Sequence, residues 1–188
     1  MKLQGFLELL VRWNRSVNLV SRADEPVLWE RHILDSLQLV PLIPPDATRA
    51  IDLGSGAGFP GLVLAIETGL PFDLIESDQR KAAFLREAAR ITGASVQVHA
   101  SRIESCHVMP APLITARALA PLPKLLALAE PHLAPGGCCL FLKGANANIE
   151  LTAATSEWHM RVESVPSRTA PDAVILRVSE IARVRSPP

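Results

Sequence analysis

Apolar residues recur along the chain with two different periods, and the change between them divides the sequence in two. Near the start the spacing is helical, which predicts an amphipathic helix over residues 3–13 and a second helical segment over residues 27–37. Three prolines at 41–45 then interrupt the pattern. We therefore expect a small helical N-terminal extension over residues 1–45, followed by a larger domain over residues 46–188.

In the larger part, short apolar runs typical of strands alternate with helical patterns. The helical patterns are clearest at residues 79–91 and 122–132. Strands and helices in alternation predict βαβ units and a mostly parallel sheet flanked by helices. Seven strands are predicted, at residues 49–53, 72–76, 95–98, 112–115, 138–142, 160–165 and 173–178.

The last two predicted strands are separated by only a short connection, PSRTAPD. It is too short for a helical crossover and suits an antiparallel hairpin at one edge of the sheet. We assign the stretch after Gly144 to these closing strands alone. The sequence thus predicts an α/β fold with a mostly parallel seven-stranded sheet and an antiparallel edge hairpin.

The segment IDLGSGAGFPG, residues 51–61, joins the first predicted strand to the first helix of the sheet. Gly54, Gly56 and Gly58 allow a tight turn and let a bulky ligand approach the backbone without a Cβ in the way. Ligands of open α/β sheets bind at this position, outside the carboxyl ends of the strands. We therefore expect the loop to bind a nucleotide or nucleoside cofactor.

Two carboxylates flank this loop. Glu76 ends the second predicted strand, about 20 residues after Gly54, where an acid reaches a ribose diol. Asp52 is placed to accept hydrogen bonds, directly or through water, from a cofactor's ammonium group and would repel a pyrophosphate. The pattern favours S-adenosylmethionine, although the stretch from Gly56 to Gly61 also satisfies the dinucleotide fingerprint. An NAD(P)-dependent oxidoreductase therefore remains an alternative.

A third expected contact follows the third predicted strand, where Ile103 and Glu104 stand side by side. The apolar side chain would cover the face of an adenine, while the acid or a neighbouring N–H would read its amino group. The same acid also suits the first turn of a helix. Spacing alone leaves both interpretations open.

Composition and spacing exclude several classes of protein. The three cysteines form no C-x-x-C pair, and we expect no metal site. His32 and Asp35 share a helical face without a third ligand, and we interpret them as hydrogen-bonded groups on a helix that closes over the cofactor; a satisfied polar patch is the alternative. No apolar run approaches the roughly 20 residues of a membrane helix, and the start of the chain lacks a signal-peptide pattern. We expect a cytoplasmic protein without a membrane partner.

Several segments in the right order resemble the RsmG (GidB) family, the bacterial methyltransferases that make N7-methylguanine in 16S ribosomal RNA. The segments are WNRSVNLVSR, RHILDSL, IDLGSGAGFPG, IESDQRKAAFLRE, SRIES, TARALAPL and LKG. The resemblance implies a class I S-adenosylmethionine-dependent methyltransferase (Rossmann-like) fold. It also implies that the cofactor is contacted by Gly54, Phe59, Ile103, Glu104 and Arg117.

The family resemblance implies a partner, 16S ribosomal RNA within the small ribosomal subunit, and neither DNA nor a membrane; we further expect a monomer. The formal net charge of zero argues against coating RNA by bulk electrostatics but allows a local basic patch. Our candidates for RNA contacts are Arg80, Lys81, Arg86, Arg102 and Lys143.

The chemistry that the resemblance implies needs little from the protein. Guanine N7 carries a lone pair and no proton, so its attack on a sulfonium methyl group needs no general base. Catalysis then consists of alignment. We expect no catalytic His–Asp pair, and Arg117 is our candidate for a positioning role. A non-catalytic RNA-binding factor of ribosome assembly with the same fold is the remaining alternative.

Overall fold

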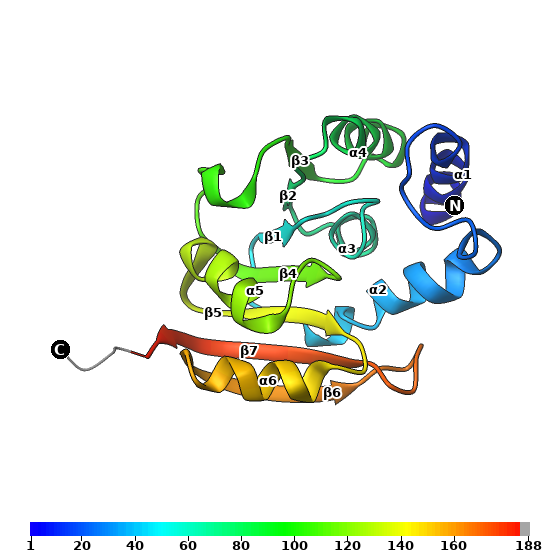
Figure 1. Ribbon diagram of the computed structural model, residues 1–188. Helices are drawn as coiled ribbons and strands as arrows, with labels where there is room; N and C mark the ends of the chain where they lie inside the picture. The colour runs from blue at the N-terminus through cyan, green and yellow to red at the C-terminus, as the bar shows by residue number, and fades with distance from the viewer. Residues whose placement is uncertain (185–188) are drawn as a thin grey trace.

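Seven strands form a single sheet in the computed structural model, which describes residues 1–184 (Figure 1). The end of the expected larger domain, residues 185–188, lies outside the described residues. The strands are β1 (Ala50–Leu53), β2 (Phe72–Ile75), β3 (Val96–His99), β4 (Ala111–Arg117), β5 (Leu133–Lys143), β6 (Trp158–Pro166) and β7 (Val174–Arg183).

The order of the strands across the sheet is β3-β2-β1-β4-β5-β7-β6. The first five strands are parallel to one another, and β7 runs antiparallel to both β5 and β6. The predicted mostly parallel sheet with an antiparallel hairpin at one edge is confirmed. Because β1 and β4 lie side by side while the chain winds outward from them in both directions, the carboxyl ends of these two strands form the crevice where such sheets bind ligands.

Helices cover both faces of the sheet (Figure 1). One hydrophobic cluster combines one face with α1, α3 and α4, and a second combines the other face with α5 and α6. The helical segments are α1 (Lys2–Asn14), η1 (Glu25–Val27), η2 (Trp29–Leu34), α2 (Asp35–Leu37), η3 (Val40–Leu42), α3 (Gly61–Thr68), α4 (Gln79–Thr92), η4 (Ile103–Ser105), α5 (Leu122–Ala129), η5 (Glu130–His132) and α6 (Ala147–Thr155).

Residues along each central strand alternate between the two clusters. Ala50 belongs to the first cluster and Ile51 to the second, and the neighbours Cys138 and Cys139 divide in the same way. Successive side chains of a strand point to opposite faces. A strand buried on both faces therefore reads as a continuous apolar run, which is why these strands are visible in the sequence.

Helix α4 shows how local sequence sets the ends of an element beside the crevice. At its start, the Asp78 carboxylate accepts hydrogen bonds from the backbone N–H groups of Arg80 and Lys81, at 2.8 and 3.2 Å. Such a cap satisfies donors that have no partner within the helix. At its end, Gly93 adopts the left-handed conformation with φ of 64°. The helix predicted at residues 79–91 thus has matching signals at both ends.

The N-terminal helix α1 packs beside α4 and α3 through aromatic residues. The ring of Phe6 lies 5.6 Å from that of Phe59 and 6.1 Å from that of Phe84, and Trp13 also contacts Phe84. These residues belong to one hydrophobic cluster with the sheet. The boundary near residue 45 stays a prediction. Among the described residues, no helix has the length and apolar character needed to span a membrane.

Two elements differ from the sequence-based expectations. The second helical segment contains a six-residue π-helix, Trp29–Leu34, in place of a regular α-helix. The stretch after Gly144 contains α6 in addition to the closing strands, so its assignment to strands alone was wrong. Only Ala147 and Ala154 are buried in α6, and two small residues leave too weak an apolar stripe to show a helical period.

Candidate functional site: a cavity across four strand ends

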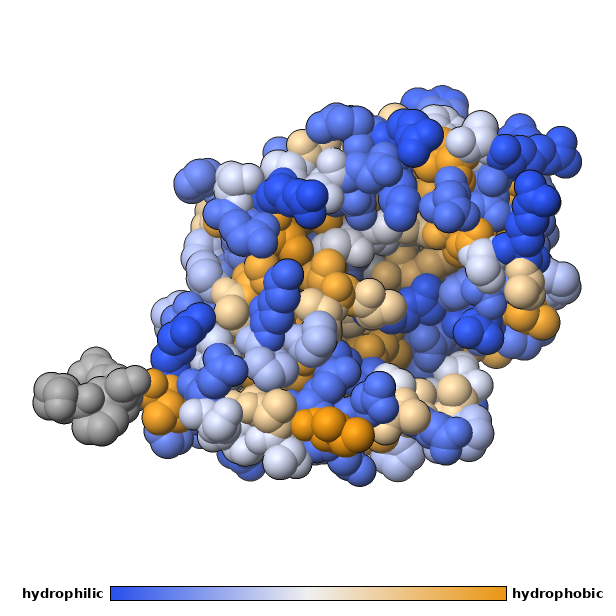
Figure 2. All heavy atoms as spheres, in the orientation of Figure 1, coloured by the Kyte–Doolittle hydropathy of each residue, from blue (hydrophilic) through white to orange (hydrophobic). Residues whose placement is uncertain are grey.

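A cavity of about 510 Å³ lies at the carboxyl ends of β3, β2, β1 and β4, and the face of the molecule drawn in Figure 2 is hollowed in its middle. The volume of this cavity is within the range of pockets that hold small molecules and cofactors. Seven of the residues predicted to bind the cofactor line it together: Gly54, Gly56, Phe59, Glu76, Ile103, Glu104 and Arg117.

The glycine loop forms the floor of the cavity. Gly54, Gly56 and Gly58 have φ values of 66°, 54° and 93°, the left-handed region that favours glycine. A Cβ on Gly56 would meet no atom closer than the carbonyl oxygen of Gly54 at 3.8 Å, so its backbone faces open space. Gly58 lies outside the lining and instead donates its N–H to the carbonyl of Ser55 at 2.7 Å. Its expected contact with the cofactor does not fit this position, because it serves the turn.

Glu76 is locked against the loop. Its Oε2 accepts the backbone N–H of Gly56 at 2.8 Å, and its Oε1 accepts that of Asp78 at 2.7 Å. The carboxylate is buried yet lines the cavity. Each oxygen keeps one further lone-pair direction, which is what a ribose diol requires.

The Asp52 side chain is not part of the lining. It is fully buried, accepts the hydroxyl of Thr115 at 2.6 Å, and lies so close to Gly61 that no Cβ would fit there. Burial raises the pKa of Asp52 to about 6, against the opposing effect of the Thr115 and Ser55 hydrogen bonds. A direct contact between this carboxylate and a cofactor ammonium group therefore does not fit the structure, because the side chain points into the base of α3.

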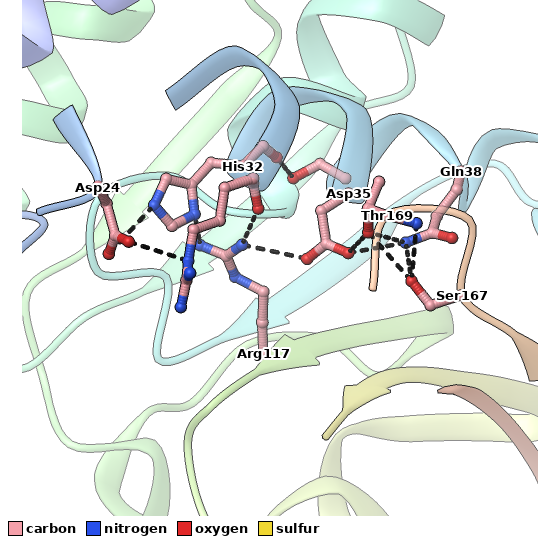
Figure 3. Close-up of polar contacts among 9 residues, drawn as sticks. Asp24, His32, Asp35, Gln38, Arg117, Ser167 and Thr169 are labelled. Atoms are coloured by element: carbon pink, nitrogen blue, oxygen red, sulfur yellow. Dashed lines mark hydrogen bonds and ion pairs between the residues drawn. The ribbon is translucent and has the colours of Figure 1, made fainter. Parts of the chain in front are cut away.

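Arg117 ends β4 and joins the cavity wall to the N-terminal helices (Figure 3). Its guanidinium donates to Nδ1 of His32 at 2.8 Å, to Oδ2 of Asp35 at 3.2 Å and to the carbonyl of Arg31 at 3.4 Å. It also lies over the ring of Phe59, with its Cζ 5.0 Å from the centroid. Desolvation by burial lowers the pKa of Arg117, and the Asp35 charge opposes that shift.

His32 and Asp35 both form hydrogen bonds with Arg117. Their spacing predicted that they share a helical face, but not that Arg117 is their partner. The His32 ring stacks on Phe59 at 4.8 Å, and Asp35 also accepts the hydroxyl of Thr169 at 2.7 Å from the β6–β7 connection. Burial, followed by the charge of Arg117, lowers the pKa of His32 to about 4. The imidazole is therefore neutral at physiological pH.

The basic residues predicted to meet RNA divide into two groups. Lys81 and Arg102 line the cavity, whereas Arg80 and Arg86 are exposed on α4, the helix that begins beside it. Lys143 lies apart from them, in the lining of the second cavity described below. Its side chain is 8% exposed, and its ammonium group donates to the carbonyl of Ala120 at 2.9 Å and pairs with Glu150, so it has little reach toward a solvent-side phosphate.

Sequence reasoning missed other lining residues, of which Asp24 is the most informative. Asp24 lies between α1 and the π-helix and, like its neighbour His32, is part of the cavity wall; its Oδ2 is 3.8 Å from Nε2 of His32. Nothing in its local sequence distinguishes it from a solvated loop acid. Only the packing of the N-terminal segment against β4 brings it to the site.

A second cavity of about 790 Å³ adjoins the first. The two share the wall formed by Asp24, His32, Arg117 and the following residues Ala118–Ala120. Lys143, Gly144 and Thr169 belong to its far side. The arrangement is suited to two ligands that meet at Arg117.

The first cavity fits S-adenosylmethionine on the observations made of it. The open backbone at Gly56 leaves room that a Cβ would fill, Glu76 offers acceptors for a ribose diol, and Ile103 offers an apolar surface for a base. Residues that would hold the cofactor are thus present in a single cavity.

Comparisons with known proteins agree with this geometry. A relative from Granulibacter bethesdensis, the ribosomal RNA small subunit methyltransferase G, is 60% identical over 97% of this chain and 86% of its own length. The protein of the same name from Gluconobacter oxydans is 57% identical over 97% of this chain and 94% of its own.

Solved structures share the fold at low sequence identity. An O-methyltransferase from Bacillus cereus, solved with S-adenosylhomocysteine, has a TM-score of 0.63 at 15% identity and covers 94% of this chain and 91% of its own. The glycopeptide N-methyltransferase MtfA, solved with S-adenosylmethionine, has a TM-score of 0.62 at 10% identity, with 79% and 86% covered. The fold expected from the family resemblance, that of class I methyltransferases, is confirmed. The model of the GidB family, described as rRNA small subunit methyltransferase G, matches residues 1–175, and the chain belongs to this family.

Proposed function

We propose that the protein transfers a methyl group from S-adenosylmethionine to N7 of a guanine in 16S ribosomal RNA of the small ribosomal subunit. The observation that carries the proposal is the pair of adjoining cavities, joined at Arg117, in a chain of this family. One cavity has the features of a nucleoside site. The other provides room for an acceptor base next to it.

The first cavity would hold the cofactor along the strand ends. Ile103 would cover the adenine, Glu76 would accept the ribose hydroxyls, and the open backbone at Gly56 would pass close to the ligand. When bound, S-adenosylmethionine supplies an electrophilic methyl group. The protein's part is to fix its direction, and Arg117 borders both cavities where that group would emerge.

The second cavity would receive the guanine. A base inside a helix cannot reach such a site, so the target has to be unpaired or turned out of its stack. Alignment of N7 with the methyl carbon and sulfur is worth up to roughly 7–11 kcal/mol in favourable cases. No side chain has to accept a proton, which agrees with a neutral, hydrogen-bonded His32.

The test is methyl transfer to defined ribosomal substrates. Purified protein and labelled S-adenosylmethionine would be incubated with 30S subunits, naked 16S RNA and 50S subunits from a bacterial strain without the corresponding enzyme. Digestion to nucleosides and mass spectrometry would identify the product. We expect N7-methylguanine in RNA from 30S subunits and none from 50S subunits.

Binding measurements separate the alternatives. Binding of S-adenosylhomocysteine without any methyl transfer to these substrates would favour a non-catalytic assembly factor. Binding of NAD without any response to S-adenosylhomocysteine would favour an oxidoreductase and overturn the proposal.

A further inference from the structure

Three polar groups meet at the β4 end of the first cavity: the Asp24 carboxylate, the His32 imidazole and the Arg117 guanidinium. Asp24 is fixed by Arg31, whose Nε lies 2.9 Å from Oδ1, and by the Ser21 hydroxyl at 2.8 Å from Oδ2. The His32 side chain is 9% exposed and the Asp24 side chain 18%. The two side chains are thus mostly shielded from solvent, and each oxygen of Asp24 has a partner.

The proton of His32 can be placed from its partners. A guanidinium only donates hydrogen bonds, so Nδ1 of His32, 2.8 Å from Arg117 Nη2, has to be the acceptor. In the neutral ring the proton therefore sits on Nε2. Nε2 is buried and has no hydrogen-bond partner in the described part of the chain; the nearest acid, Asp24, is 3.8 Å away. A buried N–H without a partner is costly, which makes it a candidate for a ligand contact.

Arg117 also has donors to spare. A guanidinium carries five N–H groups, and hydrogen bonds to Arg31, His32 and Asp35 use three of them. The other two have no acceptor among the described residues. This end of the cavity therefore offers a carboxylate beside several unused N–H donors.

The order of the strands fixes which end of the cofactor lies here. From one side of the cavity to the other, Ile103 follows β3, Glu76 follows β2, Gly54 follows β1 and Arg117 ends β4. Four strand ends span about 14 Å at the usual spacing of strands. With adenine at Ile103 and ribose at Glu76, the amino-acid end of an extended cofactor reaches β4.

We propose that Asp24 and His32, together with Arg117, bind the amino-acid end of S-adenosylmethionine: Asp24 accepts from its ammonium group, and Nε2–H of His32 and the unused N–H groups of Arg117 donate to its carboxylate. This inference rests on the proposed function, since it assumes the same cofactor. It also replaces the role expected of Asp52, whose side chain is sealed behind the loop. An amino acid carries one anionic and one cationic group, and the site presents their complements side by side.

The test compares two ligands that share an adenosine. S-adenosylhomocysteine carries the amino-acid end, whereas 5′-methylthioadenosine lacks it. Calorimetry on the full chain would give both affinities for the wild type and for Asp24→Asn, His32→Phe and His32→Gln. The phenylalanine keeps a ring to stack on Phe59 but has no N–H, while the glutamine keeps a donor near the position of Nε2.

We expect Asp24→Asn and His32→Phe each to weaken binding of S-adenosylhomocysteine about 10-fold or more, as for loss of a charge-assisted hydrogen bond. Affinity for 5′-methylthioadenosine should stay within about 2-fold of the wild-type value, because this ligand lacks the amino-acid end that the two residues are proposed to bind. His32→Gln should restore part of the loss. The control is Glu67→Gln, an exposed acid of α3 that borders neither cavity.

Equal losses for both ligands would show a merely structural role and overturn the inference, as would unchanged affinity for S-adenosylhomocysteine in both variants. The proposed function fails separately. In that case the wild type itself would bind neither ligand.

Discussion

Gly61 shows how closely the backbone of one element can approach the side chain of another. A Cβ at this position would lie 2.4 Å from Cβ and 2.6 Å from Cγ of Asp52. No real Cβ contact is that short, and the Asp52 side chain is fully buried, so it has no room to move. Here glycine is required by the packing of α3 on the end of β1, and not by a nucleotide phosphate.

Gly61→Ala is therefore expected to lower the free energy of unfolding by about 1–3 kcal/mol, the usual cost of overpacking a core. Gly5→Ala is the matched control, because a Cβ there meets nothing within 4 Å and the residue lies inside α1. It should raise stability by about 0.5–1 kcal/mol through helix propensity. Urea unfolding of both variants would measure the difference, and equal effects would contradict the packing argument.

The buried carboxyl of Asp52 should make stability depend on pH. Its folded-state pKa of about 6 lies above the ordinary value of 3.8, so the folded protein holds the proton more tightly than the unfolded chain. The resulting stabilisation is complete below pH 3.8 and is lost as the pH rises through 6. As the pH rises from 4 to 7, the free energy of unfolding of Asp52→Asn should therefore increase relative to that of the wild type by on the order of 2–3 kcal/mol. Chemical unfolding across this pH range would show it; a constant difference would contradict the raised pKa.

His32 should act in the opposite direction. Its folded-state pKa of about 4 lies below the ordinary 6.5, so its contribution to stability is present above pH 6.5 and is lost as the pH falls toward 4. The charged neighbours that face it are Arg117, Asp24, Arg31 and Asp35. Because of His32, the wild type should lose on the order of 2 kcal/mol of unfolding free energy as the pH falls over that range, and His32→Gln should not show this loss. Unfolding curves of the two variants at pH 4.5, 6 and 7.5 would separate the effects of His32 and Asp52.

At the scale of elements, the ion pair between Lys143 and Glu150 ties the end of β5 to α6. Glu150 also accepts the backbone N–H of Leu122, the first residue of α5, at 2.8 Å. The pair thus joins three elements next to the second cavity. The Lys143 side chain is 8% exposed, so removal of the Glu150 carboxylate leaves a nearly buried ammonium group without its charged partner.

Glu150→Ala should therefore cost about 3–5 kcal/mol of unfolding free energy. Arg90→Ala is the control: Arg90 pairs with Glu87 on α4, but its side chain is 71% exposed, and such surface pairs are worth about 0–1 kcal/mol. Thermal or urea unfolding would rank the two. Similar losses would contradict the structural role assigned to the pair of Lys143 and Glu150.

Elements with a strong apolar pattern were predictable from the sequence. The seven strands, α1 and α4 lie within a few residues of their expected ranges, because buried strands read as continuous runs and amphipathic helices as a period of 3.6. The short helix α6 was not predicted, because it buries only two alanines and so shows no clear helical period. The π-helix was not predicted either, since its extra residue per turn leaves no clear mark in the pattern.

The candidate site was predictable as far as local signals carried it. The glycine loop and Glu76 follow from strand–loop–helix chemistry, and the family resemblance added Phe59 and Arg117. Asp52 and Lys143 look suitable by position, but their side chains turn inward, a fact decided by tertiary packing. Asp24 reaches the site only because the N-terminal segment folds over β4, and no local pattern indicates that.

For the whole molecule, a net charge of zero means that attraction to RNA depends on where the basic residues lie. Arg102 lines the first cavity and Arg80 and Arg86 are exposed on α4, which begins beside it, whereas Arg161 on β6 is exposed at the far edge of the sheet. We expect the first group to face the RNA during methyl transfer.

Arg102→Gln and Arg86→Gln should raise the KM for 30S subunits. They should also make the negative slope of log affinity against log salt concentration shallower, by about 0.7–0.9 for each lost phosphate contact. Arg161→Gln should change neither. Methyl-transfer assays at several salt concentrations would measure both quantities. An equal response of all three variants would contradict a localised RNA-binding face.

The position of β7 has a consequence for how the protein is made. Among the described residues, β7 is the last strand along the chain, yet it lies inside the sheet, between β5 and β6. During synthesis on the ribosome, β6 emerges first and has no neighbour to pair with, while the outer edge of β5 stays open. Both edges are satisfied only after Val174–Arg183 has left the exit tunnel, so the sheet closes after all of its other strands have emerged.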